Sequence, residues 1–226
     1  VGYAANVKGG AGGPLAVFVI ALIAAVLANL LAGKTKVDII LTPAVTVLVG
    51  GLLAIFIAPP IGSFANEFGK LIMWATTQHP FVMGIIVSVI VGILLTLPVS
   101  SAAICASIGL TGLAGGAAVA GCCAQMVGFA CASFRENRVG GLVAQGLGTS
   151  MLQIGNIMKN PRIWIAPTLA SAITGPISTM VFKMEMNGPA ISSGMGTCGM
   201  VGPIGVWQGW VSTGYSATWF DWLGLL

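Results

Sequence analysis

Long apolar runs separated by short polar turns dominate the chain. The most apolar of them cover residues 14–33, 39–58, 81–97 and 163–182. A run of about 20 apolar residues spans the hydrocarbon of a bilayer as an α-helix, whereas the strands of a membrane β-barrel alternate polar and apolar positions over about ten residues. The pattern therefore predicts an all-α fold, a polytopic transmembrane helical bundle.

Prolines and polar residues divide the first part of the chain, residues 14–97, into membrane spans and one amphipathic helix. Pro59 and Pro60 follow the second run and are expected to stop its helix, because proline lacks the N–H that a helix interior uses. Residues 61–79 mix aromatic and charged side chains, a pattern typical of an amphipathic helix at the membrane interface. His79 at its end is interpreted as an exposed interfacial histidine rather than a proton relay.

Residues 98–134 form a different kind of apolar stretch. They are Gly, Ala, Ser and Cys more often than large aliphatic residues, which predicts a segment packed between other helices. Gly109, Gly112 and Gly116 recur at helical spacing and are expected to form one stripe against which another backbone packs. Polar side chains at membrane depth cost free energy unless they face protein or a watered cavity. Four such side chains lie here: Ser100, Ser101, Thr111 and Gln125.

Residues 139–158 are only half apolar and follow a polar loop predicted at 135–138. Their polar residues recur at three- and four-residue spacing, which on a helix places them on one face. That face is predicted either to lie in water on an interfacial helix or to form the wall of a cavity. The residues on it are Gln145, Thr149, Gln153 and Asn156.

Residues 183–210 hold too many glycines for a stable isolated helix. We predict a broken, re-entrant segment, because irregular backbone exists at membrane depth only where protein or a water-filled cavity surrounds it. Residues 98–210 as a whole are therefore the predicted substrate region. The tip of the segment is expected at 187–196, where Ser192 and Ser193 would bind a solute opposite the two serines that begin the central stretch. An extramembrane loop is the alternative.

Composition places the whole chain in the membrane class. It is 57% hydrophobic and 6% charged, against about 25% charged residues in globular proteins. Nine Lys and Arg against five Asp and Glu give a net charge of +4, which in so apolar a chain concerns orientation rather than nucleic acid. The basic turns at 34–38, 135–138 and 159–162 are predicted to be cytoplasmic. Because the sequence starts without an initiator Met, we expect residues 1–226 to be a single transmembrane domain that lacks N-terminal helices.

Residues with catalytic or metal-binding chemistry are sparse. The five cysteines lie in apolar segments without a C-x-x-C pair or a neighbouring histidine, and they are interpreted as small buried hydrophobes rather than a metal or redox site. The sequence contains no H-E-x-x-H, no G-x-S-x-G and no acidic pair inside a span. An enzyme is therefore the least favoured class, and neither a metal nor a cofactor is predicted.

Four short motifs, in this order, resemble a known family. They are P-V-S-S-A-A-I at 98–104, I-G-L-T-G-L-A-G-G-A-A at 108–118, K-N-P-R at 159–162 and N-G-P-A-I-S-S-G-M-G-T-C-G-M-V-G-P at 187–203. The series resembles the membrane (IIC) component family of the bacterial phosphotransferase system, in its branch related to the perfringolysin regulatory membrane protein. The resemblance covers nearly the whole chain.

The resemblance implies a multi-pass sugar-translocating component of the bacterial cytoplasmic (inner) membrane. It also implies a homodimer, an elevator-like shift of the substrate domain, and cytoplasmic phosphotransferase components as partners. On this resemblance Ser100, Ser101, residues 111–116 and residues 188–196 lie at a substrate site formed by re-entrant hairpins. The chain carries no cytoplasmic domain with a phosphoryl-accepting Cys or His, which leaves its coupling to phosphorylation open.

Two broken, glycine-rich segments among ordinary spans favour a transporter. A ligand-sensing regulatory membrane protein without net transport is the alternative, and a channel is a third possibility. The solute is predicted to be small, polar, neutral and sugar-like, because the site segments carry hydroxyls, amides and backbone groups but only one nearby ionisable residue, Glu185. Glu185 would either hydrogen-bond a sugar hydroxyl or pair with Lys183 at the membrane surface. The predicted substrate-binding residues are Ser100, Ser101, Thr111, Gly112, Gln125, Glu185, Asn187, Gly188, Ser192, Ser193 and Gly194.

Overall fold

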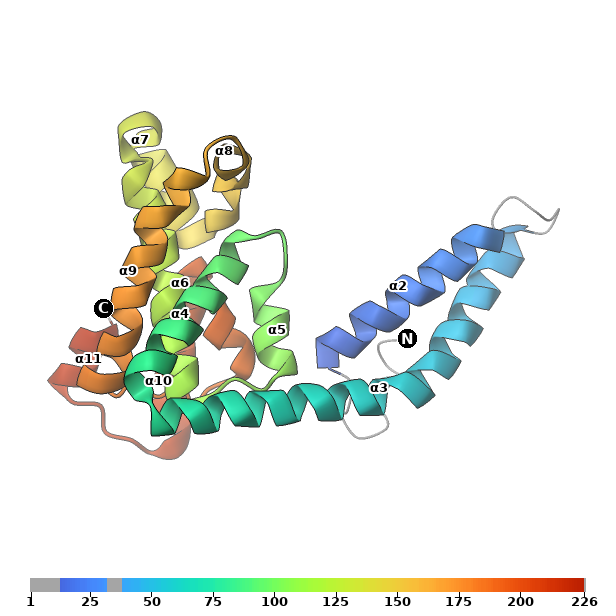
Figure 1. The fold of residues 1–226 in the computed structure, drawn as a ribbon, viewed down its shortest axis with the longest axis horizontal. Helices are drawn as coiled ribbons and strands as arrows, with labels where there is room; N and C mark the ends of the chain where they lie inside the picture. The colour runs from blue at the N-terminus through green and yellow to red at the C-terminus, as the bar shows by residue number, and fades with distance from the viewer. Residues whose placement is uncertain (1–12, 32–37, 226) are drawn as a thin grey trace. The chain divides into compact units, whose positions relative to one another are not determined.

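The structure is a computed structural model that describes residues 13–31 and 38–225. The regular secondary structure of these residues consists of helices and helical turns (Figure 1), with one isolated antiparallel bridge, between Gly112 and Met186, and no strand. The predicted all-α class is confirmed. The chain divides into two compact units, residues 1–68 and 69–226, and each is described by itself.

The first unit is a pair of packed helices. These are α2 (Gly13–Leu31) and most of α3 (Asp38–Gln78), which continues into the second unit. Ala16 and Ile20 of α2 are buried against Ala54 and Ala58 of α3. Small side chains at this contact let the two helices approach closely. The basic turn predicted at 34–38 falls outside the described residues except for Asp38.

Helix α3 runs through Pro59 and Pro60 without ending, so the predicted stop is wrong. Each proline removes one backbone N–H, and its ring crowds a carbonyl of the preceding turn. In an apolar environment, however, unwinding the helix would free more backbone groups with no water to bond them, so the continuous helix costs less. The predicted interfacial helix at 61–79 is therefore the second part of α3. His79 follows directly and its side chain is exposed.

The second unit contains the longest series of elements. In chain order they are α4 (Pro80–Thr96), α5 (Ser101–Ser107), α6 (Gly112–Ala132), α7 (Phe134–Val143), the π-turn η1 (Ala144–Gly148), the 3-10 turn η2 (Ser150–Gln153), α8 (Ile154–Lys159), the 3-10 turn η3 (Pro161–Trp164), α9 (Ile165–Pro176), the π-turn η4 (Ile177–Val181), the 3-10 turns η5 (Ala190–Gly194) and η6 (Cys198–Met200), α10 (Val201–Thr213) and α11 (Trp219–Leu225).

Helices α4, α6 and α9 form the core of this unit, and hydroxyl groups bond them to one another. Ser88 of α4 donates its Oγ hydrogen to the Ser171 carbonyl of α9 (2.8 Å), and Ser171 donates to the Gly121 carbonyl of α6 (3.0 Å). All three residues are buried, and a Cβ on Gly121 would overlap the Ser88 backbone. Because two-thirds of α6 is buried, the prediction that this small-residue segment packs between other helices is confirmed.

The prediction that Gly109, Gly112 and Gly116 form one stripe along a helix is wrong. Gly109 lies in the break between α5 and α6 and Gly112 is the first residue of α6, with φ values of 62° and 63°. Of the three, only Gly116 lies where an added Cβ would meet backbone. Among the described atoms, none lies within 4 Å of a Cβ built on Gly112. A leucine there is therefore strained by its left-handed backbone rather than by lack of space.

The predicted helix at 139–158 with one polar face is also wrong. The chain breaks at Thr149, which has extended backbone and accepts a hydrogen bond from the Met151 N–H through its Oγ1 (3.2 Å). Before the break, Gln145 is buried and donates Nε2 to Ser133 Oγ (2.9 Å). Such local side-chain bonds compete with a regular helix, and the four polar residues do not share a helical face.

The loop predicted at 135–138 is helical instead. These residues belong to α7, which kinks at Arg138 (φ 52°) and carries Glu136 in its first turn. A carboxylate near a helix N-terminus is favourable because it opposes the partial positive charge there.

Two helical stretches of the described residues are long and apolar enough to cross a membrane. They are Thr42–Ile61 of α3 and the whole of α6. Helix α4 and residues 19–29 of α2 are apolar but shorter. Whether the first, third and fourth predicted spans cross the bilayer stays a prediction.

Candidate functional site

The turn η5 lies between α5 and α6, held by side-chain hydroxyls. Ser101 of α5 donates its Oγ hydrogen to the Gly194 carbonyl (2.7 Å), and Ser193 donates to the Leu110 carbonyl just before α6 (2.7 Å). The predicted proximity of residues 187–196 to the serines at 100 and 101 is confirmed.

The hydroxyls of Ser100, Ser101 and Ser193 are hydrogen-bonded to backbone groups of the protein. Ser101, Ser192 and Ser193 are buried, and Ser100 is exposed but accepts the Ala103 N–H at the start of α5 (3.2 Å). Ser101 and Ser193 can donate a hydrogen bond to a solute only after these bonds break. Solute binding by these serines stays a prediction.

Glycines allow the backbones around η5 to touch. A Cβ on Gly194 would lie 2.6 Å from the Ser101 carbonyl oxygen, and one on Gly209 would lie 2.8 Å from the Gly188 nitrogen. A Cβ on Gly202 would lie 2.6 Å from the Gly196 carbonyl oxygen. These contacts explain why residues from 201 onward form the regular helix α10, where the sequence predicted broken structure. Close tertiary packing offsets the low helix propensity of glycine.

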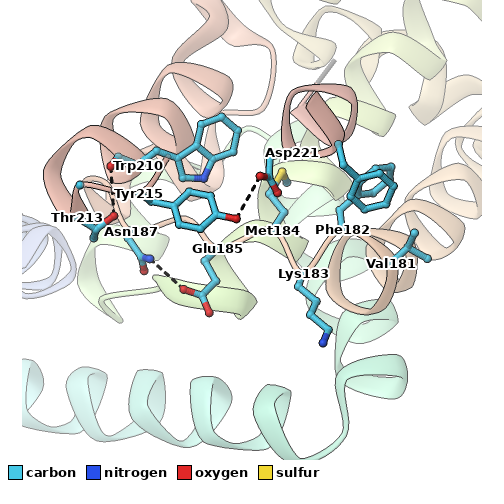
Figure 2. A pocket seen from close by; sticks show the side chains of 12 residues that line it. Val181, Phe182, Lys183, Met184, Glu185, Asn187, Trp210, Thr213, Tyr215 and Asp221 are labelled. Atoms are coloured by element: carbon cyan, nitrogen blue, oxygen red, sulfur yellow. Dashed lines mark hydrogen bonds between the residues drawn. The ribbon is translucent and has the colours of Figure 1, made fainter. Parts of the chain in front are cut away.

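A cavity of the second unit has a volume of about 900 Å³ and mixed polar and aromatic walls (Figure 2). It is lined by Val181, Phe182, Lys183, Met184, Glu185, Asn187, Trp210, Thr213, Gly214, Tyr215, Phe220 and Asp221. Of the predicted substrate-binding residues, Glu185 and Asn187 line it. The others do not.

An extended segment positions these two residues. Gly112 and Met186 exchange backbone hydrogen bonds of 2.9 and 3.0 Å, so the chain is extended there and successive side chains point to opposite sides. Met184 and Met186 are buried in a cluster with Trp210. Glu185 therefore points away from the core, as does Asn187, and both are exposed.

Glu185 and Asn187 are hydrogen-bonded to each other within the cavity. The Asn187 Nδ2 donates to Glu185 Oε2 at 3.0 Å, as Figure 2 shows. The pair leaves a second carboxylate oxygen and the amide oxygen as acceptors, and a second amide hydrogen as a donor. Lys183, two residues earlier, has a left-handed backbone (φ 46°) where the chain leaves η4.

The opposite wall comes from the last two helices and the loop between them. The Asp221 carboxylate accepts hydrogen bonds from Thr218 Oγ1 (2.7 Å), the Thr218 N–H (2.8 Å) and the Tyr215 hydroxyl (3.1 Å). Trp210 packs edge to face with Trp222 at 5.5 Å between ring centroids. On the other side, Phe182 and Phe220 lie 4.8 Å apart. Helix α11 is thus fixed at the rim of the cavity by one carboxylate and two aromatic pairs.

These hydrogen bonds shift two pKa values in opposite directions. The Thr218 hydroxyl and N–H, together with Tyr215, stabilise the Asp221 carboxylate and lower its pKa. The hydrogen bond to Asp221, with its negative charge, raises the pKa of Tyr215. A lowered carboxyl pKa contributes stability above the usual value of about 3.9, and this is lost as the pH falls through the lowered pKa. The raised pKa of Tyr215 contributes stability below about pH 10, and this stability is lost as the pH rises through the raised pKa.

We therefore expect the attachment of α11 to be unchanged between about pH 5 and 9 and to weaken below about pH 4. The 19F resonance of 5-fluorotryptophan at Trp222, assigned with Trp222→Phe, should move in acid as the contact with Trp210 loosens. Asp221→Asn should abolish this acid-dependent movement. An unchanged acid response in Asp221→Asn would show that another group controls the attachment.

Two other predicted site residues lie away from the cavity. Gln125 is fully buried between helices and donates Nε2 to Thr168 Oγ1 (3.2 Å), while its Oε1 has no hydrogen-bond partner among the described residues. Thr111 is half-buried near Met73, whose sulfur accepts its hydroxyl hydrogen at 3.6 Å. The structure does not bring these side chains to Glu185.

Sequence reasoning missed most of the cavity wall. Trp210, Thr213 and Tyr215 were not predicted as site residues, and Asp221 had no predicted role in a site. The available signal was a cluster of aromatic residues with one acid in the last part of the chain. Their position beside Glu185 depends on how α10 returns along the core, which no local pattern specifies.

Comparison with known families indicates a membrane transport component. The protein-family model described as "Phosphotransferase system, EIIC" matches residues 3–221. Neither the curated proteins nor the solved structures gave a significant match. The EIIC proteins are the membrane sugar-transport components of phosphotransferase systems and are not by themselves catalytic enzymes. The narrower resemblance to the branch of the perfringolysin regulatory membrane protein stays a prediction. The match covers nearly the whole chain, which therefore belongs to the EIIC family of the phosphotransferase system.

Proposed function

We propose that the cavity around Glu185 and Asn187 binds a neutral, sugar-like solute, which the protein carries across the membrane. The observation that supports this most directly is the hydrogen-bonded pair of Glu185 and Asn187, exposed in a large cavity beside Trp210 and Tyr215. Its volume of about 900 Å³ lies within the roughly 300–1,000 Å³ typical of small-molecule sites.

The chemistry of the walls suits a sugar. Each sugar hydroxyl both donates and accepts a hydrogen bond, and Glu185 offers an acceptor while Asn187 offers both kinds of group. The exposed aromatic ring of Tyr215, next to the largely buried Trp210, supplies apolar surface for the C–H face of a sugar ring. Asp221 already accepts three hydrogen bonds from its own chain, so it is less available as a counter-charge for a cationic solute.

In this proposal the buried serines have a positioning role. Ser101 and Ser193 fix η5 between α5 and α6, and η5 follows the segment that carries Glu185 and Asn187. Preorganised side chains bind better because less freedom is lost on binding. The hydroxyls thus support the site without contacting the solute.

Family membership supports the remaining steps. We propose that the protein is a multi-pass homodimer of the bacterial cytoplasmic membrane, that the substrate region moves in an elevator-like shift, and that cytoplasmic phosphotransferase components act on the delivered sugar. A ligand-sensing protein without net transport would bind the same solute but would not release it on the other side of the membrane.

The proposal is tested by thermal unfolding of the purified protein against a panel of neutral mono- and disaccharides. A ligand that binds only the folded state stabilises it by about 2.7 kcal/mol at a hundred times its dissociation constant. We expect at least one sugar to raise the midpoint, and charged amino acids of similar size to leave it unchanged. Absence of any response across the panel would contradict the proposal. Uptake of the binding sugar into proteoliposomes then separates transport from sensing.

A further inference from the structure

One end of the second unit carries four exposed cationic side chains. Arg135 and Arg138 lie on α7, Lys159 is the last residue of α8, and Arg162 lies on η3. Within the described residues none of the four forms an ion pair. Glu136 is the one acid between the start of α7 and the end of η3. These four cations are the basic patch, which has a net positive charge.

The packing of α6 on α9 brings the two halves of the basic patch to the same end. A Cβ on Gly128 of α6 would lie 3.1 Å from the Pro167 side chain, and Gln125 Nε2 donates to Thr168 Oγ1 at 3.2 Å. The last part of α6 therefore lies against the first turn of α9. Because α7 directly follows α6 and η3 directly precedes α9, the cations of both segments lie at this end, where Figure 1 shows α7 and α8.

This end is also the end of a helix of membrane-spanning length. Helix α6, Gly112–Ala132, is one of the two helical stretches long and apolar enough to cross a bilayer. Arg135 follows shortly after its last residue. Lys and Arg next to the end of a span lie at the level of the lipid headgroups, because they are costly within hydrocarbon. A cluster of at least four such cations beside a span attracts anionic headgroups.

Exposed apolar side chains lie directly beside the cations. Val139, next to Arg138, is 64% exposed, and Met158, next to Lys159, is 77% exposed. A free anion or an acidic soluble protein would need the charges but would leave these side chains in water. Cations beside exposed apolar residues suit the boundary where lipid phosphates meet acyl chains. The combination therefore favours a lipid surface over a soluble anion.

We propose that the basic patch binds the headgroups of anionic phospholipids. The four cations contact lipid phosphates, and the neighbouring apolar side chains contact the upper part of the acyl chains. The patch is separate from the proposed sugar cavity. That cavity lies beyond the other end of α9, where η4 follows α9 and Phe182 packs on Phe220 of α11.

The test uses the 19F resonance of 5-fluorotryptophan at Trp164, assigned with Trp164→Phe. Trp164 is half-buried and lies in η3 with Arg162. Trp222 of α11, which packs against Trp210 away from the basic patch, gives the control resonance in the same sample. The purified full-length protein in a sterol-based detergent is titrated separately with dioleoylphosphatidylglycerol, dioleoylphosphatidylcholine, inorganic phosphate and poly-L-glutamate.

We expect phosphatidylglycerol to move the Trp164 resonance but not the Trp222 resonance, and phosphatidylcholine to move neither. The movement should decrease in about 1 M salt, where the screening length is about 3 Å. No movement with phosphatidylglycerol, or equal movement with both lipids, would overturn the proposal. A response to inorganic phosphate or poly-L-glutamate without one to phosphatidylglycerol would also overturn it, and would assign the patch to a free anion or an acidic protein.

Arg135→Gln tests whether the two segments act together, because Arg135 lies on α7 and the reporter lies on η3. This variant should need about five times more phosphatidylglycerol for half of the Trp164 movement, since each Lys or Arg near an anionic surface contributes about 1 kcal/mol. Arg135→Lys keeps the charge and is the matched control, with a titration like the parent's. Because Arg135 is exposed, neither variant should change the unfolding midpoint. A parent-like titration of Arg135→Gln would contradict a patch assembled from both segments.

Discussion

Gly116→Ala is expected to prevent the second unit from folding normally. A Cβ at this position would overlap the Met184 carbonyl oxygen, which is backbone and cannot rotate away. The Met184 N–H is itself bonded to the Ser178 carbonyl (3.0 Å) and Met186 is paired with Gly112, so the segment cannot shift without losing these bonds. Overpacking of this kind costs about 1–3 kcal/mol and occasionally more, and contact with main chain places Gly116 at the upper end. The measurement is the monodisperse yield and unfolding midpoint in detergent.

Gly155→Ala is the matched control for this substitution. Gly155 lies in α8 and is exposed, and no described atom lies within 4 Å of a Cβ built on it. An alanine in a helix is favoured over glycine by roughly 0.5–1 kcal/mol, so this variant should be as stable as the parent or slightly more stable. If Gly116→Ala purified and unfolded like Gly155→Ala, the close packing of α6 on the extended segment would be refuted.

Glu185→Gln is expected to weaken sugar binding by roughly 5- to 13-fold. A hydrogen bond to a charged group contributes about 1.5–3 kcal/mol and one to a neutral group about 0.5–1.5 kcal/mol, and glutamine keeps the size of the side chain and an acceptor oxygen but not the charge. Because Glu185 is exposed and lies outside the hydrophobic clusters, the unfolding midpoint without sugar should not change. Isothermal titration with the sugar identified in the thermal screen gives the affinity.

Glu136→Gln controls for the loss of one negative charge. Glu136 is an exposed residue of α7 that does not line the cavity, so its substitution should leave the affinity unchanged. Parent-like affinity in Glu185→Gln would show that the carboxylate does not contact the sugar. Equal losses in both variants would indicate a long-range effect of net charge instead of a local contact.

The features that sequence predicted well depend on composition and local period. The small side chains of residues 98–134 correctly predicted a buried segment, because only small residues let α6 approach α4 and α9 so closely. The prediction that the helix stops at Pro59 was wrong because freeing more backbone groups in an apolar environment costs more than two missing backbone hydrogen bonds. The prediction of one polar helical face at 139–158 was wrong because each polar side chain has its own hydrogen-bond partner.

The candidate site was predictable only in part, for a related reason. Glu185 stood out because it is the one ionisable residue beside the substrate segments, and Asn187 because it begins the last motif of the family resemblance. Trp210 and Tyr215 became part of the site through long-range packing of α10. The serines were placed correctly next to η5, yet their hydroxyls face carbonyls of neighbouring segments. Sequence spacing indicates which residues are close, but not which group each one bonds.

The position of η5 between α5 and α6 also affects how the protein is made. The hydrogen bonds that fix it join residues 83 and 93 positions apart. At a synthesis rate of about 5–20 residues per second, α5 waits roughly 5–20 s before the ribosome has added the residues that bond to it. During this interval the Leu110 carbonyl and the Ser101 hydroxyl have not yet met their partners from η5. The nascent chain therefore passes through a stage in which these two polar groups must find hydrogen-bond partners other than η5.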